Sequence, residues 1–298
     1  MTDLLVRTIA KEVGVRALAC VTTELVSDAV RRHDAMPVAT AALGYGLTAA
    51  ALLGGLLKVQ QRVALKVQGD GPLGKLVTES DAYGRIRGYV AMPAVSWPTP
   101  IDGAAVGDAL GQRGLLTVVK DLHLKGVAES TVPLGAGTLD QELMVYLTQS
   151  EQVPSYVDID VKLDNRGRLL AVGGLLLQAM PGYDPDVLSA LVQATDDLPP
   201  LADMLAAGQE PAAILAALFG ALPYDVLDVT ELVFRCTCSR ERSRQALRLL
   251  DRNDLALLIA EGEAVVDCHF CHERYVFDVA DLHDLLAELA AAPDEDAG

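Results

Sequence analysis

Two kinds of hydrophobic pattern alternate along the first 180 residues. Period-two alternation or short apolar runs predict strands at residues 62–68, 75–80, 85–90, 115–121, 156–163 and 169–178. Helical spacing predicts helices at residues 4–10, 21–33, 38–57 and 138–149. The mixture of charged and apolar residues from Met1 to Cys20 predicts an amphipathic helix there. Helices and turn-linked strands in this order predict an α+β fold with packed helices on a mainly antiparallel sheet.

The pattern changes after residue 180. Short helices are expected at 186–194, 200–207 and 210–219, interrupted by Pro and Gly. Further helices are expected at 241–250, 253–261 and 280–290, with strands before Cys268 and at 274–277. The chain is therefore expected to divide into a core α+β domain at 1–180, an acidic helical linker at 181–228, a C-terminal domain at 229–290 and a disordered tail at 291–298.

Charge supports this division. The formal net charge is −17, and residues 181–228 contain eight acidic residues and neither Lys nor Arg. We expect this segment to be ordered only when it is docked on another part of the protein. The negative charge argues against a nucleic-acid partner, whose phosphates would be repelled.

One apolar stretch has the length of a membrane span. Residues 38–57 contain no charged side chain, but Ala and Gly make up much of the stretch, so its free energy of transfer into lipid is modest. We expect a buried helix beginning at Pro37 and no membrane partner. The N-terminus mixes charged residues with apolar ones and does not resemble a signal peptide, so we expect a cytoplasmic protein in a reducing compartment.

Four of the five cysteines lie in two close pairs, Cys236-Thr237-Cys238 and Cys268-His269-Phe270-Cys271. Two such pairs can supply four sulfur ligands to one tetrahedral Zn²⁺. The Cys-X-Cys spacing is shorter than the usual Cys-X-X-Cys and favours a disulfide as the alternative to the metal. The pattern thus indicates both a metal site and a redox site. Cys20, on a predicted apolar helix, is expected to be a small, buried hydrophobic side chain.

Three competing motifs are weaker. Gly69–Lys75 approaches a phosphate-binding loop, but Leu76 replaces the required Ser or Thr and a strand follows. Cys268–His272 matches a haem-attachment motif, which would leave Cys236 and Cys238 unexplained. A thioredoxin-like site would place Cys268 and Cys271 at a helix N-terminus, whereas strands are predicted on both sides.

Two sets of side chains flank the cysteines. His269 and His272 are expected to form hydrogen bonds or to lie exposed, because four cysteines already complete a tetrahedral shell. Arginines surround the first pair; they either form a solvated helix face or stabilise thiolates electrostatically. This set is Arg235, Arg240, Arg242, Arg244 and Arg248.

Several motifs together resemble a known family. Cys-X-Cys followed by Ser239–Arg242, and Cys-X-X-Cys followed by Tyr275–Asp278, resemble the heat-shock protein 33 family. Further similar motifs lie at Arg87–Val90 with Pro93, Ser150–Ser155, Gly173-Gly174 and Gln178–Pro181. The resemblance extends from Asp3 to Leu286.

This resemblance implies a redox-regulated, ATP-independent holdase chaperone and not an enzyme. Cys236, Cys238, Cys268 and Cys271 would hold one Zn²⁺ in the inactive, reduced form. Oxidation would join Cys236 to Cys238 and Cys268 to Cys271, release the metal and unfold the C-terminal domain. We expect residues 181–228 then to undock and expose apolar surface that binds clients.

The resemblance also implies partners: unfolding client proteins, ATP-dependent chaperones of the DnaK type that refold them, and a second copy in an active homodimer.

The cysteine pairs are also compatible with two other functions. A thiol–disulfide oxidoreductase would use Cys268 and Cys271 catalytically and reduce insulin with turnover. A zinc-stabilised interaction module would lose its function on oxidation, whereas a holdase of this family would gain it.

Overall fold

A computed structural model describes residues 2–124, 126–135 and 137–291. The chain forms two compact units that divide between Arg235 and Cys236. Each unit has its own hydrophobic core. We describe them separately.

The first unit contains two sheets. One has the strand order β10-β1-β2-β9-β8 and is antiparallel throughout; its strands are β1 (Leu4–Ala10), β2 (Val15–Val21), β8 (Ser155–Leu163), β9 (Leu169–Ala179) and β10 (Asp225–Glu231). The other has the order β11-β5-β4-β3-β6-β7, with one parallel pair at β11–β5; its strands are β3 (Arg62–Gly69), β4 (Lys75–Asp81), β5 (Arg85–Val90), β6 (Gly114–Leu124), β7 (Gly126–Pro133) and β11 (Val233–Phe234). The predicted α+β class with mainly antiparallel strands is confirmed.

Seven helices accompany these sheets in the described part of the first unit: α1 (Thr23–His33), α2 (Pro37–Gly54), α3 (Gly103–Leu110), α4 (Leu139–Gln149), α5 (Pro185–Asp196), α6 (Leu201–Ala206) and α7 (Pro211–Phe219). The predicted strands are confirmed as β3, β4, β5, β6, β8 and β9, and the predicted helices at 21–33 and 138–149 as α1 and α4. The sequence did not predict α3 or β7. Most side chains of β7 are exposed, so it lacks an apolar pattern.

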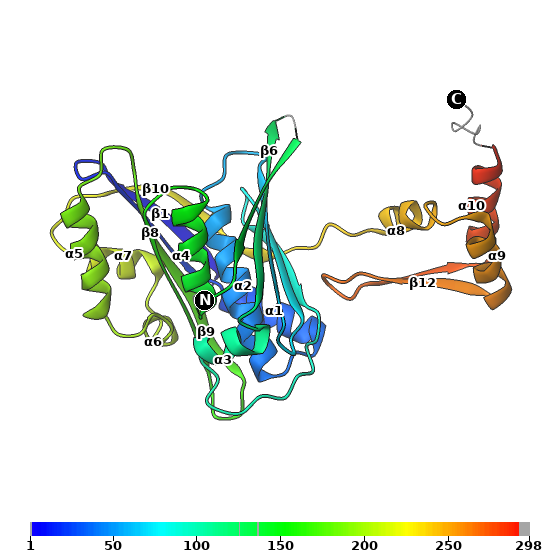
Figure 1. Cartoon of the computed structure of the whole chain (residues 1–298), viewed down its shortest axis with the longest axis horizontal. Coiled ribbons are helices and arrows are strands. Elements are labelled where there is room, and N and C mark those ends of the chain that lie inside the picture. The colour runs from blue at the N-terminus through cyan, green and yellow to red at the C-terminus, as the bar shows by residue number, and fades with distance from the viewer. Residues whose placement is uncertain (1, 125, 136, 292–298) are drawn as a thin grey trace. The chain divides into compact units, whose positions relative to one another are not determined.

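Helix α2 forms the centre of the first unit, between the two sheets (Figure 1). Its small residues allow this close packing: a Cβ added at Gly44 would lie 2.9 Å from Val161 of one sheet, and one at Gly46 would lie 2.7 Å from Leu76 of the other. Among the described residues, one helix, Pro37–Gly54, is long and apolar enough to cross a membrane, but 94% of it is buried inside the protein. The prediction of a buried helix is confirmed.

Helices α5, α6 and α7 cover the other face of the first sheet (Figure 1). Apolar side chains of β1, β2 and β9 pack there against buried residues of these helices: Leu191, Leu201, Ala202, Met204, Leu205, Ile214, Leu215, Leu218 and Phe219. Polar contacts add to the packing, since Asp160 of β8 accepts a hydrogen bond from the backbone N–H of Ala202 at 2.9 Å. The segment expected to be a linker is thus docked through its apolar side chains, while its charges remain on the outside.

The prediction of an amphipathic helix at Met1–Cys20, including Leu4–Ala10, is wrong. Residues 4–10 and 15–21 form the antiparallel hairpin β1–β2, with Gly14 at φ +65° in its turn. Helices cover both faces of this sheet, so its strands need apolar residues on both sides and lose the alternation that marks a half-exposed strand. The spacing of Arg7, Lys11 and Arg16 then imitates the polar face of a helix.

The end of the expected linker also differs from the predicted pattern. Residues 225–231 form β10, which pairs with β1, and residues 233–234 form β11, which pairs with β5. The second compact unit accordingly begins at Cys236, whereas the sequence placed the boundary at 229. Residues 292–298 of the expected tail lie outside the described residues.

The second unit consists of α8 (Arg240–Leu247), α9 (Arg252–Glu261), the hairpin β12 (Glu263–Asp267) and β13 (Arg274–Asp278), and α10 (Val279–Ala291). Its described buried apolar cluster is small: Leu247, Leu255, Ala264, Phe277, Leu282 and Leu285. The Arg240 guanidinium packs over the ring of Phe277, with its central carbon 4.4 Å from the ring centre. A core of this size leaves a small domain only marginally stable.

Candidate metal centre

The first cysteine pair lies in an extended segment just before α8. Ser239 caps this helix, its hydroxyl accepting a hydrogen bond from the Arg242 backbone N–H at 3.2 Å. The Arg242 guanidinium returns to the pair and donates to the Thr237 carbonyl oxygen at 2.8 Å and to its hydroxyl at 2.9 Å. Arg242 thereby fixes the residue between Cys236 and Cys238.

The second pair lies in the turn between β12 and β13. The backbone N–H of Cys268 donates to the Glu273 carbonyl at 2.9 Å, and the N–H of His272 donates to the Cys268 carbonyl at 2.8 Å. His272 has φ +56°, the left-handed conformation that lets the chain reverse direction. The turn brings the thiols of Cys268 and Cys271 to the same side.

The two pairs meet. The four Sγ atoms all lie within 4.8 Å of one another, with 3.6 Å between Cys236 and Cys268 and 3.3 Å between Cys238 and Cys271. Zn–S bonds of about 2.3 Å in a tetrahedron require sulfur atoms about 3.8 Å apart. The arrangement therefore fits one tetrahedral ion, and these four cysteines could hold a metal.

Electrostatics explain why such a cluster needs a cation. Burial, followed by hydrogen bonds with neighbouring thiols, raises the pKa of Cys271 well above its usual range, and burial also raises the pKa of Cys268. Four adjacent thiolates would repel one another, whereas a bound cation favours the deprotonated form. Soft sulfur ligands select Zn²⁺, Cu⁺ or iron–sulfur chemistry among the biological metals.

One tyrosine contacts the cluster directly. The Tyr275 hydroxyl donates a hydrogen bond to Cys238 Sγ at 3.2 Å, and this bond is the first cause of the raised pKa of Tyr275. Tyr275 lies on β13, just beyond the second pair. From the sequence, Tyr275 stands out only as part of a family motif, because a hydrogen bond between residues 37 positions apart leaves no local pattern. Arg242 is already among the arginines expected to flank the first pair.

Tyr275→Phe is expected to weaken metal binding by about 10- to 100-fold, the usual effect of removing a hydrogen bond to a metal ligand. The change removes the donor and keeps the ring. Competition with a chromophoric chelator measures the metal affinity. Tyr83→Phe, at a half-exposed tyrosine of the first unit, is the matched control and should leave the affinity unchanged. Equal affinities for both variants would show that the Tyr275 hydrogen bond does not support the site.

The arginines near the first pair bind specific partners. Arg240 and Arg244 form ion pairs with Asp281 at 2.5 Å and Glu288 at 2.7 Å, both on α10, and Arg248 lies 3.9 Å from Glu288. Arg242 bonds to Thr237, as described above. Arg235 belongs to the first unit. The arginines of α8 thus form ion pairs that join α8 to α10, and they are not simply a solvated helix face.

The competing motifs do not form their expected sites. In the Gly69–Lys75 loop, the N–H groups of Gly71 and Leu73 donate to the Leu110 and Ala109 carbonyls at 3.0 Å, so they are not directed at a phosphate. Cys268 and Cys271 lie in a hairpin turn, away from the helix N-terminus that a thioredoxin-like site requires. Cys20 is 1% exposed, and burial raises its pKa to about 12, as expected of an inert thiol.

The fold and this centre define a protein with an α+β domain and a small cysteine-rich unit that can bind a metal. The chain matches the family model described as Hsp33 protein over residues 3–278. It is 46% identical to a 33 kDa chaperonin of Geobacter sp. strain M21, over 97% of this chain and 99% of that protein. It is 38% identical to the 33 kDa chaperonin of Halalkalibacterium halodurans, over 97% of this chain and all of that protein.

A solved structure agrees. The crystal structure of the 33 kDa chaperonin (heat shock protein 33 homologue) of Thermotoga maritima superposes with a TM-score of 0.89 at 30% identity, covering 98% of this chain and all of that one. This chain therefore belongs to the Hsp33 family of chaperones.

Proposed function

We propose that this protein is a redox-regulated, ATP-independent holdase: inactive with its four cysteines reduced and on zinc, and active after oxidation. The observation that supports this most is the meeting of four thiols in a unit with a small apolar core. Zn²⁺ bound to Cys236, Cys238, Cys268 and Cys271 would contribute folding free energy on the order of 10 kcal/mol. Removing these thiolates would thus remove the main stabiliser of the second unit.

The oxidation balances with peroxide as the oxidant. Cys236 and Cys238 lose two electrons as their S–S bond forms, and Cys268 and Cys271 lose two more. Each peroxide molecule accepts two electrons as its O–O bond breaks, giving two hydroxide ions. Two molecules of peroxide therefore consume all four thiolates and leave no sulfur ligand for the metal.

Exposure of apolar surface would follow from the position of the linker. Helices α5–α7 cover an apolar sheet face, and the chain from these helices leads through β10 and β11 directly to Cys236. We propose that unfolding of the second unit makes the docking of 181–228 marginal. Both the uncovered sheet face and the apolar sides of the released helices would then bind unfolding proteins.

Further parts of the proposal rest on family membership. We propose a cytoplasmic protein without catalytic turnover, a homodimeric active form, and transfer of clients to DnaK-type chaperones when reducing conditions return.

An oxidoreductase that uses Cys268 and Cys271 is the second candidate, and the insulin reduction assay distinguishes it by turnover. The hairpin position of that pair favours the holdase.

The test is suppression of citrate synthase aggregation by the reduced, zinc-loaded protein and by the peroxide-treated protein. We expect suppression only after peroxide, and its reversal by a thiol reductant. Hydrogen exchange of residues 181–228 in the same samples should accelerate as activity appears. Equal suppression by both forms would contradict the proposed switch, and continued protection of 181–228 would contradict the role of the linker.

A further inference from the structure

Strand β10 is held to the rest of the first unit mainly by its backbone. It lies at the edge of its sheet, with β1 as its neighbour. Six of its seven side chains are exposed, including Val226, Leu227 and Val229, and Thr230 is half-buried. Burial of its side chains therefore contributes little to its attachment.

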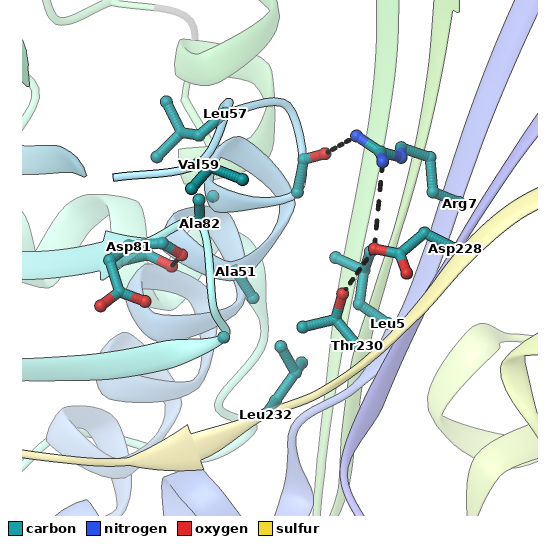
Figure 2. Close-up of a pocket in the computed structure, with 14 residues that line it drawn as sticks. Leu5, Arg7, Ala51, Leu57, Val59, Asp81, Ala82, Asp228, Thr230 and Leu232 are labelled. Atoms are coloured by element: carbon teal, nitrogen blue, oxygen red, sulfur yellow. Dashed lines mark hydrogen bonds and ion pairs between the residues drawn. The ribbon is translucent and has the colours of Figure 1, made fainter. Parts of the chain in front are cut away.

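The space behind β10 is incompletely filled. A cavity of about 130 Å³ lies between this strand, the end of α2 and the turn between β4 and β5 (Figure 2). Asp228 and Thr230 form one wall of it, and Arg7 of β1 reaches across to the Gly55 carbonyl at 3.1 Å. If β10 dissociated, few packing contacts would therefore be lost on the side that faces this cavity.

Two ion pairs set the charge preference of this edge. Asp228 lies 3.9 Å from the Arg7 guanidinium, and Asp225 lies 2.7 Å from the Lys11 ammonium. The carboxylates are 50% and 60% exposed, so water screens each pair and its contribution to stability is small. They favour an acidic partner strand without binding it firmly.

Strand β1, in contrast, is built into the fold. It pairs with β2 along its whole length, from Leu4–Val21 to Ala10–Val15. Leu5, Val6 and Ala10 are at most 2% exposed. When β10 leaves, β1 remains as a sheet edge whose outward N–H and C=O groups need new partners.

We propose that this β1 edge is a docking site for unfolding proteins, which add an extended segment as a strand in the place of β10. The inference rests on the proposed function, because the edge becomes available only after the linker is released. Backbone hydrogen bonds give affinity in such strand addition, and alternate side chains give specificity.

The register of β10 defines the segment that fits. Val229 lies opposite Val6 and Val226 opposite Thr8, so apolar side chains suit this face. Asp228 lies opposite Arg7 on the other face, so acidic side chains suit that one. The preferred client segment is therefore extended and alternates apolar with acidic residues. Leu227 is the additional residue of a β-bulge, which a client strand need not reproduce.

Residue-resolved hydrogen exchange of the full-length protein tests the site, with citrate synthase as client and aggregation measured in parallel. The amides of residues 4–10 that bond to β10 should be protected in the reduced protein. They should exchange faster after peroxide, at least tenfold, and become protected again when client is bound.

Each other outcome is decisive. If aggregation is suppressed while these amides stay fast, clients bind elsewhere; if they stay protected after peroxide, β10 has not left. Either result overturns the inference and leaves the proposed function intact. Absence of holdase activity after peroxide would reject both.

A peptide probe tests the chemistry of the partner. A fluorescent peptide with the sequence of residues 225–231 should bind the oxidised protein and not the reduced one. Its counterpart with Lys at both Asp positions keeps length and pattern, and should bind about tenfold more weakly, because two weak attractions become repulsions. A backbone N-methylated version should not bind. Equal binding by all three peptides would overturn strand addition.

Discussion

Chelation of the metal is expected to unfold the second unit while the core of the first unit stays folded. The described apolar core of the second unit has six buried side chains with seven partly buried ones packed against them, a small core for a domain of this size without a further constraint. Loss of zinc would remove binding free energy on the order of 10 kcal/mol. Amide dispersion in NMR spectra, before and after a strong chelator, measures the outcome for each unit.

Two variants sharpen this experiment. Cys268→Ser should have the effect of chelation even with zinc present, because it removes one of four ligands. Cys20→Ala, at a buried cysteine of the first unit, should retain full zinc stoichiometry and a folded second unit. The fluorescence of Trp97, the single tryptophan of the chain, reports on the first unit in every sample. A second unit that remains folded after chelation would show that its small core is sufficient.

Leu215→Ala is expected to activate the reduced protein without peroxide. Leu215 of α7 is fully buried against the first sheet, and truncation of a buried leucine costs about 2–5 kcal/mol. Since each 1.4 kcal/mol is a factor of ten, the population with an undocked linker should rise by at least about 25-fold. The measurement is suppression of citrate synthase aggregation by the reduced variant, with its zinc content determined in the same sample.

The matched control is Leu170→Ala, the same truncation at a side chain of β9 that is 46% exposed. It should leave the reduced protein inactive. For Leu215→Ala, one outcome would contradict the proposed client-binding surface itself. If hydrogen exchange shows an undocked linker and the zinc-loaded variant still does not suppress aggregation, the surface under α5–α7 does not bind clients.

The accuracy of the sequence predictions depended on how many faces of a strand are buried. Strand β3 was predicted because Val63, Leu65 and Val67 are buried while its other side chains are more exposed. Strand β2 was not predicted, because helices lie on both faces of its sheet. Six of its seven residues are buried, so its sequence does not alternate between apolar and polar residues. The charged residues at the turn and edge of the β1–β2 hairpin are spaced like the polar face of a helix, and this spacing led to the wrong prediction of a helix.

At the metal centre, cysteine spacing was sufficient to predict the cluster. Four soft ligands in two close pairs are the usual ligand pattern of a structural zinc site. The sequence did not show that Tyr275 bonds to Cys238 or that β10 pairs with β1. Both contacts join residues far apart in the chain. The acidic residues Asp225 and Asp228 indicated the end of a linker, because their basic partners, Lys11 and Arg7, lie near the other end of the sequence.

The arrangement of the thiols also has a topological consequence. A metal held by both pairs closes a loop across the twenty-nine residues between Cys238 and Cys268, a cross-link that removes about 3–4 kcal/mol of chain entropy from the unfolded state. Disulfides within the pairs enclose one and two residues and abolish this long-range tie. Disulfides from Cys236 to Cys268 and from Cys238 to Cys271 would preserve it. The same four-electron oxidation can therefore release the unit or lock it, depending only on which sulfurs join.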